Sequence, residues 1–164
     1  MAQPIPLPTS HWLHDFPGLK FSSMEFYSEV EATLKAREFP GAKASRISLN
    51  QTGIFSAKRE YLRVVNREMT FEICAAPYGT GFFMSWWYDE RVGALKSFLY
   101  RIPIIGPFFL KASEMKTYYQ WDTEAMYREA VRSCLNEVIQ KVTSAGGIRG
   151  LSDLELQAHE GKIQ

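Results

Sequence analysis

Near its beginning the chain shows an apolar pattern with the period of a helix. The apolar positions that share one face recur every four residues: Phe26, Val30 and Leu34. This spacing predicts an amphipathic helix, because residues four apart lie above one another on a helix surface. Ser22 and Glu25 have the spacing of a capping box at its start, and Pro40-Gly41 ends it.

A second helical pattern lies towards the other end of the chain. It begins at Asp122 or Thr123 and stops at Gly146-Gly147. The apolar positions of its main stripe are Tyr127, Val131, Cys134, Val138 and Val142. The pattern predicts a longer amphipathic helix that buries this stripe against the rest of the fold.

Between the two helices, segments of alternating apolar and polar residues predict strands. They cover about residues 44–51, 56–65, 69–76 and 81–89. The gap between the second and third segments predicts a hairpin with a two-residue turn at Asn66-Arg67. That turn would place Val64 opposite Met69 on the neighbouring strand.

The next hairpin is predicted to have a four-residue loop at 77–80, which places Phe71 opposite Trp86. With both turns in place, one face of three strands becomes apolar. It carries Leu62, Val64, Met69, Phe71, Ile73, Met84 and Trp86. A slip of one residue would destroy this agreement, because side chains alternate between faces. The sequence therefore predicts an α+β fold, a four-stranded antiparallel β-meander with an N-terminal and a C-terminal amphipathic helix packed on one face.

The length of 164 residues suits one domain, and 46% apolar residues are enough to fill a core. We expect residues 1–21 to form an extended Pro-rich arm, and 22–146 to form the single α+β domain. Trp12, Phe16 and Phe21 could pin the arm to that domain. Residues 147–164 are expected to be a C-terminal tail, in which Ser152 and Glu155 have capping-box spacing for one short helix.

The two cysteines, Cys74 and Cys134, match no metal-binding or redox spacing. Each lies in an apolar periodic segment, so both are predicted to be buried free thiols in a reducing cytoplasm. The first 17 residues contain four prolines and neither Lys nor Arg, which is unlike a secretory signal. No run of apolar residues reaches the roughly 18–20 that a membrane-spanning helix needs.

The opposite face of the predicted sheet is the first candidate binding site. The register collects aromatic and charged residues there: Arg59, Tyr61, Arg63, Glu72, Phe83, Ser85 and Trp87. Aromatic rings beside arginines can stack on bases and hold phosphates, so this face could bind a phosphorylated ligand or single-stranded nucleic acid. The alternative is the exposed side of a half-buried sheet, with arginine stems packed over the rings.

An apolar connector, Ile102–Leu110, is the second candidate site, and a short helix is expected before it, near 92–100. Its two prolines exclude a regular helix through its middle. With flanking cations it could touch an anionic membrane surface, and the alternative is that it folds over the core. The expected contact residues are Arg101, Ile104, Ile105, Phe108, Phe109 and Lys111.

Motifs for catalysis, metals and cofactors are weak. His11 and His14 with Asp15 could ligate a metal only on a helix, and no partner ligand lies nearby. Gly79-Thr80-Gly81 joins two strands, so it is interpreted as a turn and not as a phosphate loop. A small enzyme with a pocket between the sheet and the C-terminal helix remains an alternative, and Glu60 is the one acid that the register places on the core face. We predict no cofactor and no metal.

Four blocks of sequence are distinctive. They are ICAAPYGTGFFMSWW at 73–87, IPIIGP at 102–107, TYYQWDT at 117–123 with Met126 after it, and GIRGLSDLE at 147–155. Together they resemble a family of uncharacterised bacterial membrane-associated proteins. In that family hydrophobic spanning segments lie between the first two blocks, whereas Tyr88–Tyr100 is too short here to span. The resemblance implies a bacterial cytoplasmic domain and supplies no catalytic residues.

These patterns favour a non-catalytic binding or interaction module. Its expected partner is an anionic membrane surface or a membrane protein, at the cytoplasmic face of a bacterial inner membrane. The net charge of +1 gives no strong field for nucleic acid, although six basic residues and one acid lie between Lys43 and Arg67. Nucleic acid therefore stays an alternative partner.

Overall fold

The structure, a computed structural model, describes residues 10–50, 58–90, 116–152 and 160–162. In chain order the elements are β1 (Ser10–Pro17), α1 (Ser23–Ala36), β2 (Lys43–Asn50), β3 (Lys58–Asn66), β4 (Met69–Tyr78), β5 (Gly81–Glu90), α4 (Tyr118–Ala145) and β6 (Glu160–Lys162). The strands form one antiparallel sheet in the order β2-β3-β4-β5-β1-β6. The predicted α+β class with an antiparallel sheet is confirmed.

The expectation of four strands is wrong, because the described sheet has five long strands and a three-residue sixth. The additional long strand is β1, which comes from the segment expected to be an extended arm. It pairs with β5 on one side and with β6 on the other. Trp12 and Phe16 lie on the face of β1 that points towards the core, and both are buried, so they are part of the sheet itself. Pro17 is the last residue of β1, a position that proline tolerates.

Both predicted hairpins form, but each is shifted by two residues. The turns are Arg67-Glu68 and Gly79-Thr80, so Val64 pairs with Phe71, and Phe71 pairs with Tyr88. The backbone φ is +55° at Arg67 and +60° at Gly79, as tight two-residue hairpin turns require. A shift of two residues keeps every side chain on its face. The predicted apolar face is therefore correct, and all seven of its residues are buried.

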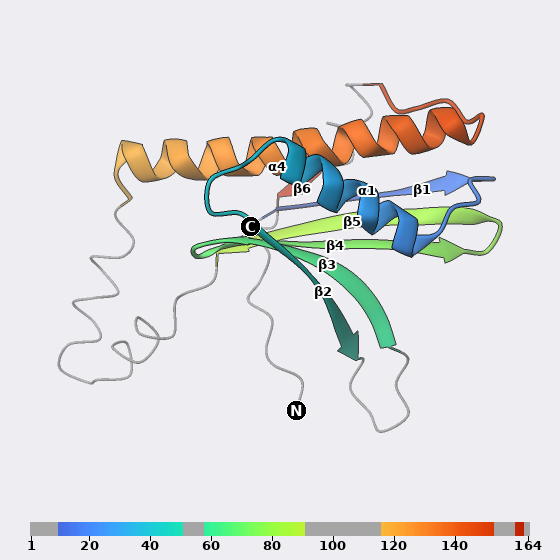
Figure 1. Cartoon of the computed structure of the whole chain (residues 1–164), viewed down its shortest axis with the longest axis horizontal. Helices are drawn as coiled ribbons and strands as arrows, with labels where there is room; N and C mark the ends of the chain where they lie inside the picture. The colour runs from blue at the N-terminus through green and yellow to red at the C-terminus, as the bar shows by residue number, and fades with distance from the viewer. Residues whose placement is uncertain (1–9, 51–57, 91–115, 153–159, 163–164) are drawn as a thin grey trace.

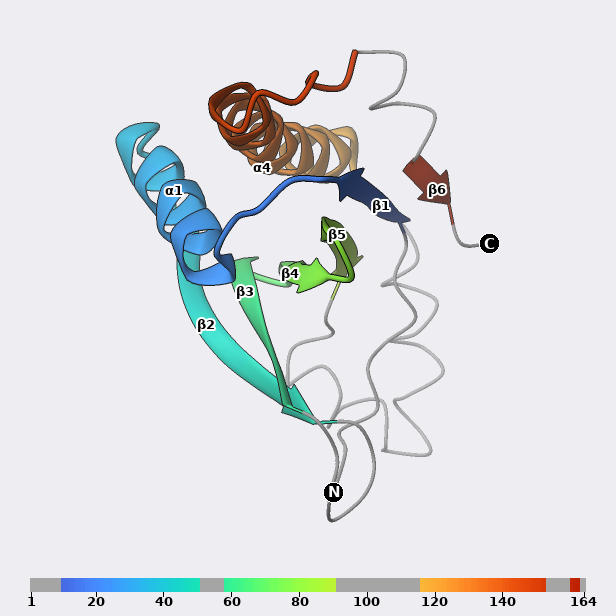
Figure 2. The same cartoon turned by 90° about the vertical axis from the view of Figure 1, so that its right-hand side faces the viewer.

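The core lies between this face and the apolar stripes of the two helices. Figures 1 and 2 show both helices on the same side of the sheet. The buried residues of α1 are Phe26, Tyr27, Val30 and Leu34, and those of α4 include Tyr127, Val131, Cys134, Leu135, Val138, Ile139 and Val142. Cys74 and Cys134 are free and buried, as predicted, and burial raises the pKa of both thiols.

The ends of the helices differ from the sequence expectation. Ser22 is the N-cap of α1, but its side chain forms no capping hydrogen bond. Helix α4 begins at Tyr118, earlier than the expected Asp122, because Thr117 caps it. The expected short helix near 92–100 lies outside the described residues, as does most of the one expected from Ser152.

Candidate binding surface at the start of helix α4

Large exposed apolar side chains gather on the first turns of α4. Their exposed fractions are 90% for Tyr118, 76% for Tyr119, 53% for Trp121 and 71% for Met126. At about 100° per residue these four fall within about 160° of the helix circumference, opposite the buried stripe. We call these four residues the aromatic surface. The other exposed large apolar residues described, Leu13, Met24 and Tyr78, are scattered singly, which is ordinary for a protein surface.

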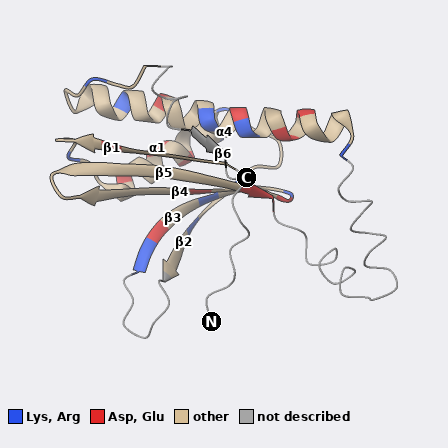
Figure 3. Ribbon diagram, turned by 180° about the vertical axis from the view of Figure 1, so that it is seen from behind, with Lys and Arg blue, Asp and Glu red and all other residues tan. Residues whose placement is uncertain are grey.

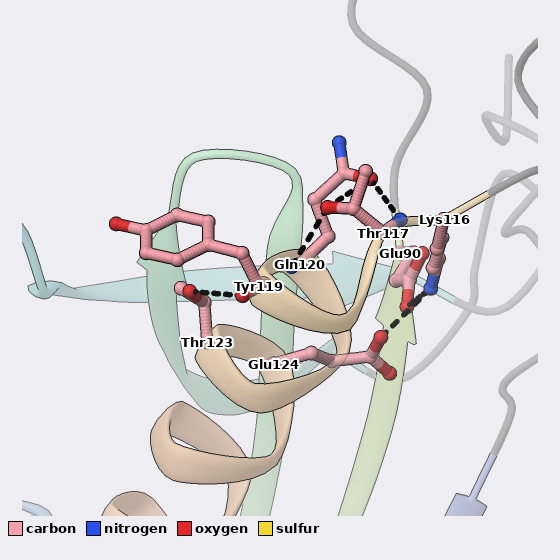
Figure 4. A network of polar contacts seen from close by, with 7 residues as sticks. All are labelled: Glu90, Lys116, Thr117, Tyr119, Gln120, Thr123 and Glu124. Carbon is pink, nitrogen blue, oxygen red and sulfur yellow. Dashed lines mark hydrogen bonds and ion pairs between the residues drawn. The ribbon is translucent and has the colours of Figure 1, made fainter.

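The backbone under the aromatic surface is held by a capping box. The Thr117 hydroxyl accepts a hydrogen bond from the Gln120 N–H at 3.3 Å, and the Gln120 side chain accepts one from the Thr117 N–H at 2.8 Å. One turn later, the Thr123 hydroxyl donates to the Tyr119 carbonyl at 2.7 Å (Figure 4). The Thr117 N–H, which no helix carbonyl can reach, is thereby satisfied, and the Gln120 N–H gains a second acceptor beside the Thr117 carbonyl. The rings therefore project from an ordered first turn.

A compact charge cluster lies beside this turn. The Lys116 ammonium donates to the carboxylates of Glu90 and Glu124, and the bond to Glu124 is 2.7 Å long (Figure 4). The same ammonium lies 4.6 Å from the centroid of the Trp121 ring, within cation–π range. Glu90 is the last residue of β5, so the cluster ties the start of α4 to the sheet. Two carboxylates and one ammonium give the ionised cluster a net charge of −1.

The environment shifts the pKa values of the two carboxylates in opposite directions. Burial raises the pKa of Glu90, and a hydrogen bond shared with Glu124 raises it further. Burial by itself would also raise the pKa of Glu124, but hydrogen bonds with Glu90 and Lys116 outweigh it and hold that pKa below its ordinary value. The pair therefore takes up its first proton on Glu90, at a pH above the ordinary range of a glutamate.

Two further groups face the cluster from the sheet and the helix. Burial, followed by the charge of Glu124, raises the pKa of the Tyr88 phenol far above its ordinary value, so it stays a neutral hydroxyl. Arg128, one turn after Glu124, lies over the Tyr88 ring with its guanidinium carbon 6.0 Å from the centroid. Figure 3 shows that acidic and basic residues are interspersed along α4.

Two carboxylates with separated pKa values are typical of acid–base sites. Here, however, Lys116 fills the position between the carboxylates, where a cation or a reacting group would bind. A groove of about 230 Å³ lies elsewhere, between α1 and strands β2 and β3, where Leu34, Phe39 and Val64 line it. Among the described residues no group of three or more metal-ligating side chains is present. The arrangement is suited to carrying charge beside a contact surface.

The structure brings together three of the residues expected on the other sheet face. Arg63 donates to Glu72 at 2.7 Å, and Glu72 lies opposite Trp87 on β5. Trp87 in turn stacks on His11 of β1, with ring centroids 4.9 Å apart. These residues form one row across four strands. The charge of Arg63 is balanced by Glu72, which weakens this face as a phosphate site. His11 was missed because β1 was not expected in the sheet.

The remaining residues of that predicted site are less closely connected. Arg59 is exposed, while Tyr61 and Phe83 are half-buried on the same side of the sheet. The metal hypothesis for His11 and His14 is not supported, because residues three apart on a strand point to opposite faces. The pairing with β5 supports this conclusion. His11 lies opposite Trp87 and His14 lies opposite Met84, and these two β5 residues are also three apart, so they face opposite sides of the sheet.

The expected membrane-contact residues, Arg101 to Lys111, lie outside the described residues. In the part of the chain that the structure describes, no helix is both long and apolar enough to cross a membrane. Comparison of the chain with protein-family models, with curated proteins and with solved structures finds no match.

Proposed function

We propose that this chain is a non-catalytic interaction module that adheres to an anionic membrane surface through the aromatic surface of α4. The observation that carries the proposal is the exposure of Tyr118, Tyr119, Trp121 and Met126 on one side of a capped helix start. In the sequence this surface follows the apolar connector, after residues 111–117. The expected contact residues of the connector and its flanks are Arg101, Ile104, Ile105, Phe108, Phe109 and Lys111.

The chemistry of these side chains suits a bilayer interface. Tyrosine and tryptophan have an apolar body and a polar edge, and both are enriched where acyl chains meet headgroups. A cluster of exposed rings is costly in water, whereas burial of each ring in the interface is favourable. Because the capping box already orders the first turn, little conformational entropy is lost on binding.

Vesicle retention tests the proposal directly. We expect the protein to co-sediment with vesicles that contain phosphatidylglycerol, and the double variant Tyr119→Ser/Trp121→Ser to lose about ten-fold or more in affinity. The matched control is Tyr78→Ser. Tyr78 is also a strongly exposed tyrosine, but it lies beside the β4–β5 turn, at the opposite end of β5 from Glu90. Failure of the unaltered protein to sediment, or an equal loss in the control, would contradict the proposal.

The structure gives less support to the enzyme alternative. That alternative needed Glu60 as an inward-facing acid, and Glu60 is exposed on β3. Its backbone carbonyl, and not its carboxylate, takes part in the core by accepting a hydrogen bond from Tyr27. The described residues therefore bring no acid from this position towards a pocket beside α4.

A further inference from the structure

Acidic side chains lie at the edge of the aromatic surface. The Glu90–Lys116–Glu124 cluster has one more carboxylate than it has ammonium groups, and Lys116 contacts the Trp121 ring. Asp122 adds a second negative charge within the arc of the aromatic surface, and it is exposed. The carboxylates oppose adhesion to an anionic membrane and Arg128, which lies over the Tyr88 ring, favours it, because charges within about one Debye length, roughly 10 Å, interact through little screening.

The arrangement of the cluster allows one negative charge to be removed by protonation of a carboxylate. Both carboxylates reach the same ammonium, and they are close enough to share a proton. From β5 the cluster is faced by Tyr88, from α4 by Arg128, and from β4 by the apolar Met69 opposite Glu90. Burial raises the pKa of the Tyr88 phenol and keeps it a neutral hydroxyl, and Arg128 contributes a positive charge. The carboxylate pair is therefore the group of this cluster that gains a proton as the pH falls, on Glu90, whose pKa is raised by burial and by the hydrogen bond with Glu124.

We propose that the Glu90–Lys116–Glu124 cluster is a proton-operated charge switch for the aromatic surface. Uptake of one proton by the carboxylate pair takes the cluster from −1 to neutral and strengthens adhesion to anionic lipid. This inference rests on the proposed membrane function and assigns its regulation. The proton comes from the solvent and remains on the carboxylate pair, so the step needs no other reactant.

The expected effect is modest and measurable. One unit of charge near an anionic bilayer changes affinity by about five-fold. Retention on phosphatidylglycerol vesicles should therefore rise by about five-fold in total as the pH falls from neutral through the raised pKa of Glu90. Retention on phosphatidylcholine vesicles should not change in the same range, because that headgroup has no net charge. Phosphatidylglycerol is the suitable probe because its phosphate stays ionised throughout.

Glu90→Gln replaces the titrating carboxylate by a neutral side chain of the same shape. We expect this variant to bind phosphatidylglycerol vesicles at neutral pH as tightly as the unaltered protein binds them in acid, with no further rise. Asp122→Asn is the matched control, since it also removes one negative charge from the region. It should bind more tightly at both pH values and keep the pH dependence.

The outcomes separate the two proposals. If the unaltered protein binds neither vesicle type at any pH, the membrane function is wrong. If it binds anionic vesicles equally at both pH values, or if Glu90→Gln retains the pH dependence, the charge switch alone is wrong. Circular dichroism checks that the variants fold. Should Glu90→Gln fail to fold, the comparison of the two vesicle types with the unaltered protein still decides.

Discussion

The carbonyl oxygen of Phe16 lies 2.8 Å from the position that a Cβ on Gly81 would occupy. Strands β1 and β5 therefore approach each other at this point more closely than any side chain on Gly81 permits. The Asp15 carboxylate and the Pro17 backbone lie 3.2 Å from the same position. Glycine at position 81 therefore allows β1 to pair with β5 as far as Pro17, the last residue of β1.

Gly81→Ala should destabilise the fold, because the obstructing atoms belong to the backbone and cannot rotate away. We expect a loss of about 1–3 kcal/mol in the free energy of unfolding, measured by urea denaturation. Gly146→Ala is the control. Its new Cβ would lie equally close to Leu19, but to the mobile end of a side chain, so the loss should be smaller. Equal losses would show that the strand contact is not the cause.

Tyr27 connects α1 to two strands through one hydroxyl. The hydroxyl accepts from the Ala75 N–H at 2.9 Å and donates to the Glu60 carbonyl at 2.9 Å. Tyr27→Phe should cost about 1–2 kcal/mol in thermal or urea unfolding, because a buried N–H loses its partner. Tyr127→Phe removes a single bond, to the Val64 carbonyl, and should cost less. The reverse order would contradict this account.

Lys116→Met should lower stability to a degree that depends on pH. Without the ammonium, Glu90 and Glu124 would face each other as like charges in a half-buried position. The loss in the free energy of unfolding should be about 1 kcal/mol at neutral pH, which is modest because solvent screens the pair of carboxylates. It should shrink as the pH falls through the raised pKa of Glu90, where one carboxylate becomes neutral. Urea unfolding at neutral and acidic pH checks this, and a loss that grows in acid would refute it.

The Arg63–Glu72 pair offers a test on the other sheet face. The Glu72 side chain is only 9% exposed, so removal of Arg63 takes this ion pair away from a largely buried carboxylate. Arg63→Met should therefore cost about 3 kcal/mol or more, and Arg63→Met/Glu72→Met should cost less than that single change. A double-mutant cycle in urea measures the coupling. Simple additivity would mean that the two residues do not act as a pair.

The sequence predicted the faces of the sheet better than its register. Alternation identified Leu62, Phe71 and Trp86 as core residues, because parity survives a shift of two residues. The turn positions were less determined, since both Asn66-Arg67 and Arg67-Glu68 are polar and a positive φ at Arg67 carries no sequence signal. Strand β1 was missed because the prolines around it outweighed the alternation of Trp12 and Phe16.

The contact surface was harder to foresee. The capping box at Thr117 and Gln120 is visible in the sequence. It was overlooked because Tyr118, Tyr119 and Trp121 do not continue the buried stripe of α4, which is the reason that they are exposed. The pairing of Glu90 with Glu124 has no signal of spacing at all, since the end of a strand and the start of a helix meet only in the tertiary structure.

The place of β1 between β5 and β6 has a consequence for the order of assembly. During synthesis β1 leaves the ribosome before the other described elements, and its partner β5 follows only after α1 and three further strands have emerged. Until then Trp12 and Phe16 have no sheet to join, and an unpaired apolar strand is a hazard for aggregation. The β2–β5 meander can pair locally, so β1 is expected to dock late and to set the folding rate through its distant contacts.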